Sequence, residues 1–222
     1  MPIAADVRDA VLDELTWDTS LDAAAIGVAA TNGAVTLTGH VRSYAEKRAA
    51  EKAAKRVEGV LAVANDLEVR LPSLFQRDDT DVATAVASAL EWNVNVPSKV
   101  TATVQGGWVS LEGEVDWSFQ RNAAERAVRD LVGVRGVSNL IQIRARALPS
   151  GVKDQIRKAF ARSAQIDADH VKVTVEDGRI VLTGTVRSWS ERSEAEHAAW
   201  AAAGVRDVVN RLHVSGYSAA LL

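Results

Sequence analysis

Residue types able to do acid–base or metal chemistry are few and scattered along this chain. Cysteine is absent, which excludes disulfides, thiolate metal sites and a thiol nucleophile. No histidine has another histidine four residues away, and each repeated glutamate is a single carboxylate, whereas acid–base catalysis needs two converging groups with separated pKa values. The sequence therefore predicts no catalytic residue, no metal site and no cofactor. The histidines are His40, His170, His197 and His213, and the repeated glutamates are Glu51, Glu125 and Glu196.

Tryptophan is the residue type whose abundance points to binding, because the chain has six tryptophans against two tyrosines and three phenylalanines. Trp17 and Trp92 match each other at the end of the first predicted helix of a repeat, and we expect them to close a core. The other four are predicted to be exposed, where large apolar rings indicate contact surfaces. They lie beside a hairpin turn, at the start of a helix or on a helix face: Trp108, Trp117, Trp189 and Trp200.

Two related octapeptides place an aromatic ring between cations: VRSYAEKR at 41–48 and VRSWSERS at 186–193. Tyr44 or Trp189 occupies the first helical position after a serine N-cap. Cations flank the rings at Arg42, Arg187 and Arg192. Such a ring suits the headgroup region of anionic phospholipid, and it equally suits packing against a neighbouring domain or a partner. If lipid is the ligand, the second repeat should contribute least, because Asp116 stands there at the position of Arg42 and Arg187.

The elements that hold these residues occur three times along the chain. A strand pattern of the form V-x-L-x-G-x-V, with isoleucine first in the last copy, occurs at 35–41, 109–115 and 180–186. Six residues before each glycine stands another glycine, in a dipeptide of the kind that two-residue hairpin turns prefer. These dipeptides are Asn32-Gly33, Gly106-Gly107 and Asp177-Gly178. Because apolar residues alternate before each turn, every repeat predicts an antiparallel strand pair.

Helices flank this strand pair in every repeat. An amphipathic stretch with apolar residues at i, i+4 and i+8 opens each unit, and an alanine-rich helix follows the glycine strand. A last strand begins at Asn65, Asn139 or Asn210, always 26 residues after the anchor glycine. The predicted fold class is α+β: three tandem αββαβ units, each with two helices packed on one face of a three-stranded mixed sheet. We expect domain boundaries at 1–71, 72–147 and 148–222.

Charge and hydropathy exclude several classes of protein. The net charge is −3, and none of the three repeats is strongly basic, so we expect no nucleic-acid partner. The N-terminal stretch carries acidic residues where a signal peptide needs a cationic start, and no apolar run reaches the length of a transmembrane helix. We therefore expect a cytoplasmic protein, or one peripheral to the inner membrane, without a transmembrane segment.

The order of elements and the repeated phrases resemble the BON domain, the module named for osmotically inducible (OsmY-type) and nodulation proteins. The resemblance rests on the V-x-L-x-G-x-V strand, the small-residue helix with its glutamate, the Gly-Val at its end and the asparagine before the last strand. It covers nearly all of the chain, three times. It implies a non-catalytic module that binds phospholipid surfaces and serves in envelope stress, and the family also includes a potassium-binding cytoplasmic group.

Three functions remain open on these grounds. The first is peripheral binding of anionic phospholipid by the first and third repeats. The second is a protein-interaction or self-assembling scaffold, for which a homo-oligomer is a natural outcome, and the third is an ion-binding sensor. The candidate contact residues for lipid or a protein partner are Arg42, Tyr44, Trp108, Trp117, Arg187, Trp189, Arg192 and Trp200.

Overall fold

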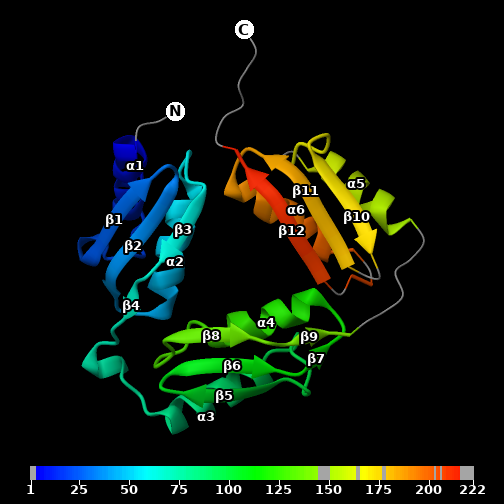
Figure 1. Ribbon diagram of the computed structural model, residues 1–222. Helices are drawn as coiled ribbons and strands as arrows, with labels where there is room; N and C mark the ends of the chain where they lie inside the picture. Colours follow the sequence, from blue (N-terminus) through cyan, green and yellow to red (C-terminus); the bar gives the residue numbers. More distant parts are fainter. Residues whose placement is uncertain are drawn as a thin grey trace.

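The computed structural model describes residues 4–144, 151–163, 166–176, 179–202, 204–205 and 207–215. They form three successive units with the order helix, strand, strand, helix, strand (Figure 1), which confirms the predicted α+β class. The first unit contains α1 (Ala4–Trp17), η1 (Ala23–Ala25), β1 (Ile26–Thr31), β2 (Ala34–Val41), α2 (Tyr44–Arg56), β3 (Ala62–Asn65) and β4 (Glu68–Val69), and η2 (Ser73–Phe75) follows it. The second contains α3 (Asp79–Glu91), β5 (Thr101–Gln105), β6 (Trp108–Glu112), β7 (Glu114–Val115), α4 (Ser118–Val128), β8 (Gly136–Asn139) and β9 (Gln142–Ile143). The third contains α5 (Val152–Arg162), β10 (Val171–Glu176), β11 (Arg179–Val186), α6 (Trp189–Trp200) and β12 (Asp207–Val214).

Each unit has a mixed sheet whose middle strand is the second strand along the chain, and the second unit has a further two-stranded sheet of β7 and β9. β2, β6 and β11 pair antiparallel with the strand before them and parallel with the strand after the second helix. The strand orders are therefore β1-β2-β3, β5-β6-β8 and β10-β11-β12. Short strands β4 and β9 continue the last strand of the first two units, beside β2 and β7.

The predicted hairpin turns have the backbone conformation that their residues favour. Asn32 and Gly33 both have positive φ, at 50° and 79°, and so do Gly106 and Gly107, at 59° and 79°. A type I′ turn needs positive φ at both central residues. The third predicted turn, at 177–178, lies outside the described residues.

The glycine of each strand pattern has a structural reason to be glycine. Gly39, Gly113 and Gly184 have φ of 110°, 130° and 124°. A Cβ atom at these positions would lie 2.0–2.5 Å from a backbone carbonyl oxygen just before the first strand. These glycines therefore allow two backbone segments to approach closely, which any other residue would prevent.

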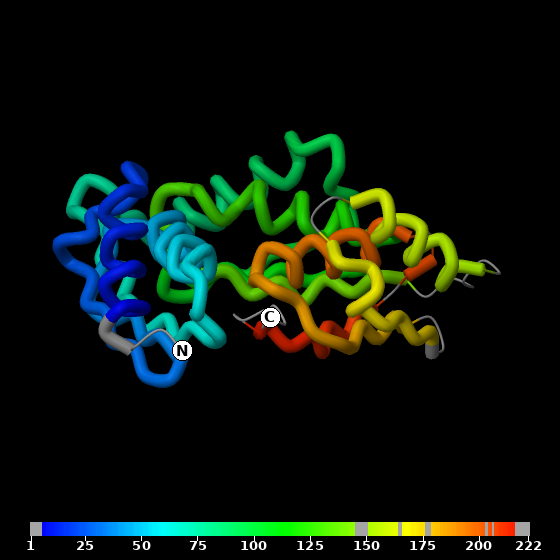
Figure 2. Tube along the Cα trace, turned by 90° about the horizontal axis from the view of Figure 1, so that it is seen from above, coloured from blue at the N-terminus to red at the C-terminus, as the bar shows by residue number. Residues whose placement is uncertain are grey.

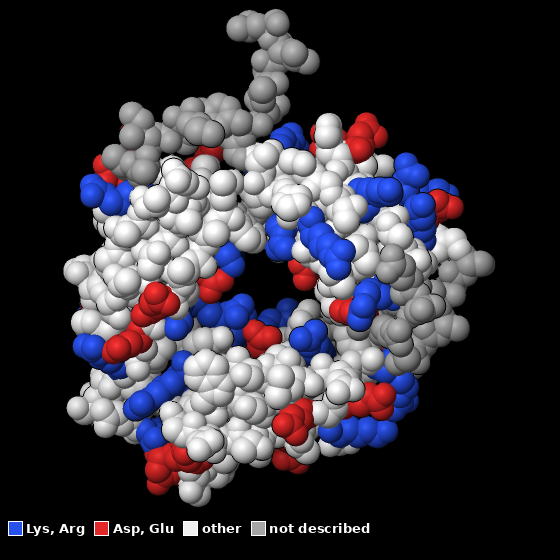
Figure 3. Space-filling view, viewed as in Figure 1, with Lys and Arg blue, Asp and Glu red and all other residues white. Residues whose placement is uncertain are grey.

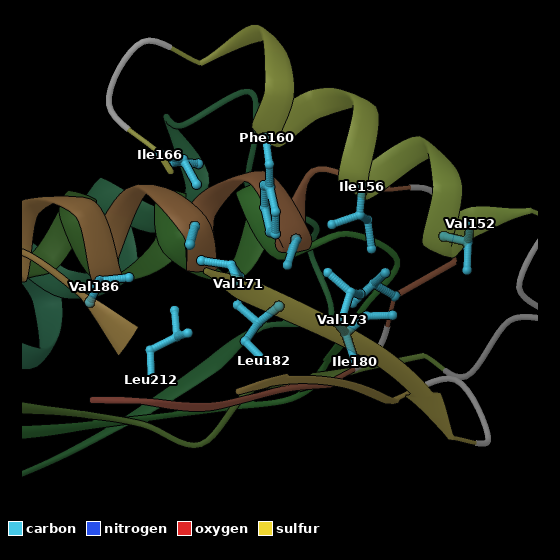
Figure 4. Close-up of a cluster of buried hydrophobic side chains, with 13 residues drawn as sticks. Val152, Ile156, Phe160, Ile166, Val171, Val173, Ile180, Leu182, Val186 and Leu212 are labelled. Carbon is cyan, nitrogen blue, oxygen red and sulfur yellow. The ribbon is translucent and has the colours of Figure 1, made fainter. Parts of the chain in front are cut away.

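Apolar residues from the first helix and the sheet form a separate core in each unit. In the third unit, Val152, Ile156 and Phe160 lie one turn apart on α5 and point toward the sheet (Figure 4). Ile180 and Leu182 meet them from β11. Alanines of the second helix are buried in every unit, so that each helix axis lies close to its sheet.

The prediction that Trp17 and Trp92 close a core is wrong, because the two residues are 83% and 88% exposed. Each follows a buried leucine, Leu15 or Leu90, by two positions. Two residues turn about 200° around an α-helix, so the tryptophan lies on the side opposite the apolar stripe. The leucines complete the core instead.

The three units enclose a central opening, which the space-filling view shows (Figure 3). In Figure 1 the second unit lies below the other two, and α2 of the first unit contacts α6 of the third. Seen from above, the first and third units lie next to each other and the second unit spans both (Figure 2). The arrangement is a ring of three units.

Candidate interaction site at the unit junctions

The second helices of the units line the central opening of the ring. A cavity of about 980 Å³ lies there, walled by α2, α6 and the turn after α4. Its lining carries both signs of charge, with Arg48, Lys52 and Arg192 among the cations and Glu46, Glu51 and Glu194 among the carboxylates. Two candidate contact residues of the third unit, Trp189 and Arg192, lie on this surface, facing α2 of the first unit.

Trp189 joins the third unit to the first. It begins α6 directly after Ser188, whose hydroxyl caps the helix. The indole Nε1 donates a hydrogen bond to the carbonyl oxygen of Val60 at 2.9 Å. The ring lies near two cations, with Lys55 Nζ 5.1 Å and Arg192 Cζ 5.2 Å from its centroid. Because cations within about 6 Å of an indole are attracted to its face, this half-buried ring binds both units.

Tyr44, the equivalent residue of the first unit, joins that unit to the second. Its half-buried ring packs against the apolar core of the second unit. One turn further along α2, Arg48 forms an ion pair of 3.3 Å with Glu125 of α4. Burial opposes the charge of Arg48, but hydrogen bonding to Tyr44 and the Glu125 carboxylate raise its pKa above the usual value. These three side chains form one connected contact across the junction.

The junction between the second and third units has no ring at this position, because Ser118 stands where the other units have Tyr44 and Trp189. Instead, Trp200 of the third unit and Arg121 of the second line a cavity of about 470 Å³. The prediction that Trp200 lies on an exposed helix face is therefore corrected. Its side chain packs partly against the third core and faces the neighbouring unit, which a comparison of repeats within one sequence does not show.

An asparagine ties each second helix to the last strand of its own unit. Asn65 Nδ2 donates to the carbonyl oxygen of Lys47 at 3.1 Å and to Glu51 Oε2 at 3.3 Å. The other units repeat the side-chain pair as Asn139 with Glu125 at 3.2 Å and Asn210 with Glu196 at 2.9 Å. Sequence inspection leaves these glutamates isolated, although the constant spacing of 14 residues to the asparagine is a signal for the pair.

Glu51 also holds Lys55 in place beside Trp189. The Lys55 ammonium and the Glu51 carboxylate form an ion pair of 2.5 Å across one helical turn. Burial opposes the ionisation of Glu51, but hydrogen bonds from Lys55 and Asn65 outweigh it and lower the pKa of this carboxyl. The carboxylate is therefore charged at neutral pH and fixes the cation that meets the indole.

The candidate arginines all have partners within their own unit. Arg42 pairs with Asp22 at 2.6 Å, and Arg187 lies 3.4 Å from the buried carboxylate of Glu191. Arg192 donates to two backbone carbonyl oxygens of β12, at 2.8 Å and 3.2 Å. Two of these cations remain open to solvent, since the side chains of Arg42 and Arg187 are 64% and 62% exposed.

Exposed aromatic rings among the candidates lie on the second unit. Trp108 is 49% exposed, and its Nε1 donates to Ser138 Oγ at 2.9 Å. Trp117, the N-cap residue of α4, is 37% exposed, and Phe119 beside it is 54% exposed. The candidate rings of the first and third units lie at junctions, so the exposed and the junctional rings are on different units.

The described ranges contain no group of three or more histidine, aspartate or glutamate side chains placed to hold a metal ion. Over the same ranges, no helix has the length and apolar character needed to cross a membrane. The chemistry that the junctions offer is recognition: an aromatic ring, a backbone carbonyl and paired charges that hold one unit on the next.

Comparison with known proteins identifies the family. The model of the family described as "BON domain" matches residues 4–70, 78–145 and 150–216. The chain therefore belongs to the BON-domain family, with three copies of the domain in tandem. This assignment agrees with the resemblance found in the sequence.

Two relatives and one solved structure illustrate the similarity. The osmotically-inducible protein Y of Escherichia coli (strain K12) is 32% identical over 144 residues, covering 61% of this chain and 72% of that protein. A protein of Anaplasma centrale, "Uncharacterized protein in gshII 5'region", is 46% identical over 44 residues, covering 20% and 29%. CdsD, a structural protein of the type III secretion system of Chlamydia trachomatis, is 17% identical, covering 95% of this chain and 92% of that chain. Its TM-score of 0.25 is too low for any structural conclusion.

Proposed function

We propose that this chain is a non-catalytic interaction scaffold associated with osmotic stress, built from BON domains at 1–71, 72–147 and 148–222. The association with osmotic stress rests on its similarity to the osmotically-inducible protein Y. The scaffold role rests on one observation above all: Trp189 binds the Val60 carbonyl oxygen and meets Lys55 of another unit. Two of the candidate contact residues, Tyr44 and Trp189, pack between units and thereby support this assembly.

A closed ring presents surfaces that the separate units do not have. The central cavity takes residues from all three units, and the second unit adds exposed rings at Trp108, Trp117 and Phe119. Aromatic residues are enriched among those that dominate binding at protein interfaces. The second unit is therefore the proposed contact surface for a protein partner.

Removing the Trp189 ring tests the scaffold. The variant Trp189→Ala loses the hydrogen bond to Val60 and the contact with Lys55, so the third unit should separate from the first. We expect small-angle X-ray scattering to record a larger radius of gyration and a longer maximum dimension than for the unchanged protein. Trp92→Ala is the matched control, because this tryptophan is 88% exposed. An unchanged scattering curve for Trp189→Ala would contradict the proposal.

Peripheral binding of anionic phospholipid is the second candidate function. It is favoured by the exposed cations Arg42 and Arg187 and by the exposed rings Trp117 and Phe119. Co-sedimentation with neutral and anionic vesicles, at low and moderate salt, tests it. Binding that needs anionic lipid and is lost in Trp117→Ala/Phe119→Ala would support it, and no binding to any vesicle would exclude it.

A further inference from the structure

The contact between the third and first units differs from the other two junctions in its connectivity. Residues 70–78 lead from the first unit into α3, and residues 144–151 lead from the second unit into α5. No such segment joins the third unit to the first. Non-covalent contacts hold the two units together there, among them those of Trp189 with Lys55 and Val60.

The two faces of this contact are complementary and not identical. The third unit supplies an indole N–H and an aromatic face from the start of α6. The first unit supplies a cation from the last turn of α2 and a backbone carbonyl from the segment that follows. Every chain therefore carries one copy of each face, which is the requirement for a heterologous, head-to-tail interface.

We propose that this contact also forms between chains, so that the third unit of one copy docks on the first unit of a second copy. The proposal rests on the scaffold function above, because it uses the same contact. An intermolecular contact makes the same hydrogen bond to Val60 and the same cation contact with Lys55 as the closed arrangement of three units. The two arrangements differ mainly in the effective concentration that the linkers provide inside one chain.

The assemblies that form when chains make this contact with each other follow from the geometry of the interface. Two open chains that dock reciprocally make two such contacts and form a closed dimer. Chains that dock in one direction only form an open filament, as heterologous interfaces do when they do not close. The partner that fits the exposed faces of an opened ring is a second copy of this chain.

Complementation between two defective variants tests the proposal. Trp189→Ala lacks the indole face, and Lys55→Glu carries a carboxylate where the cation meets the ring. Each variant alone has no functional pair of faces, so both should remain monomers. Their mixture contains one intact pair, the indole of the Lys55→Glu chain and the cation of the Trp189→Ala chain.

Sedimentation equilibrium measures the outcome. We expect each variant alone to stay at the monomer mass of 23.7 kDa, and the mixture to approach twice that mass as concentration rises toward 1 mM. This range covers the roughly millimolar effective concentrations that short flexible linkers provide. The double variant Trp189→Ala/Lys55→Glu is the control, and it should remain a monomer in a mixture with either single variant.

Scattering curves of the single variants separate the two proposals. One outcome is that Trp189→Ala opens the ring of three units while the mixture stays monomeric throughout this range. That result would refute the contact between chains and leave the proposed scaffold function supported. If Trp189→Ala leaves the ring closed, both proposals fail. If the double variant also dimerises, a different surface is responsible and the assembly proposed here is wrong.

Discussion

Two junctions can be compared because they use the same positions of the repeat. One joins the third unit to the first, and the other joins the second unit to the third. At the former, Trp189 enters from the start of one second helix and meets Lys55 near the end of another. At the latter, serine replaces the ring, and Trp200 replaces the lysine. The aromatic side chain thus comes from the start of a second helix at one junction and from the end of a second helix at the other. The repeat therefore determines where units touch, and single substitutions determine how well the contact is filled.

The first test of this comparison removes the aromatic side chain from the third junction, where Tyr44 of the first unit packs against the second unit. Tyr44→Ala should lower the free energy of unfolding by about 2 kcal/mol, because a half-buried ring leaves the core of the second unit. Urea unfolding followed by circular dichroism measures the change. Trp92→Ala, which removes an exposed ring, should stay within about 0.5 kcal/mol. Equal effects of the two variants would show that Tyr44 does not hold the units together.

The second test adds an aromatic side chain to the junction between the second and third units, where a cavity lies. In Ser118→Tyr the new ring should meet Trp200, and an aromatic pair contributes about 1 kcal/mol. Hydrogen exchange should then be roughly fivefold slower for amides of β8 and β12, since this ratio corresponds to about 1 kcal/mol. Ser88→Tyr on the exposed side of α3 is the control. Faster exchange in Ser118→Tyr would mean that the cavity does not accept the ring.

The smallest expected effect concerns the cation that meets Trp189. The pKa of Glu51 is lowered in the folded protein from its usual value of 4.5. Its ion pair with Lys55 therefore contributes stability above pH 4.5, and this contribution is lost as the pH falls through the lower, folded-state pKa.

Glu51→Gln should accordingly lower the free energy of unfolding at pH 7 by about 0.5 kcal/mol, the usual size for a pair one helical turn apart. The difference between variant and unchanged protein should shrink below pH 4.5. Urea unfolding at pH 7 and at lower pH measures it. Glu58→Gln, on an exposed residue of the turn after α2, is the control. A difference that grows on acidification would have the wrong sign for this explanation.

Much of the fold is predictable from the sequence because it depends on local signals. Asn32-Gly33 has the backbone conformation that the dipeptide favours, and the i, i+4, i+8 spacing places Val152, Ile156 and Phe160 in one core. The error at Trp17 is also local, since the residue's angular position on α1 predicts exposure once it is compared with Leu15.

The junctions are less predictable because they depend on how separate units meet. The sequence singles out Tyr44 and Trp189 as contact residues but leaves lipid, another domain and a partner as alternatives. Trp200 aligns with cations in the other repeats, which predicts exposure on the helix of a single unit. Its position changes only when the neighbouring unit is present, and no pattern within one repeat contains that information.

The asparagine–glutamate pairs have a mechanical consequence. Because Asn65, Asn139 and Asn210 each fasten a second helix to its sheet, bending should be confined to the junctions and each unit should move as a rigid body. Three rigid bodies joined at three points behave like a triangular frame, which cannot change shape without breaking a joint. With one joint released, the same bodies become a hinged arm that can sweep through a wide arc.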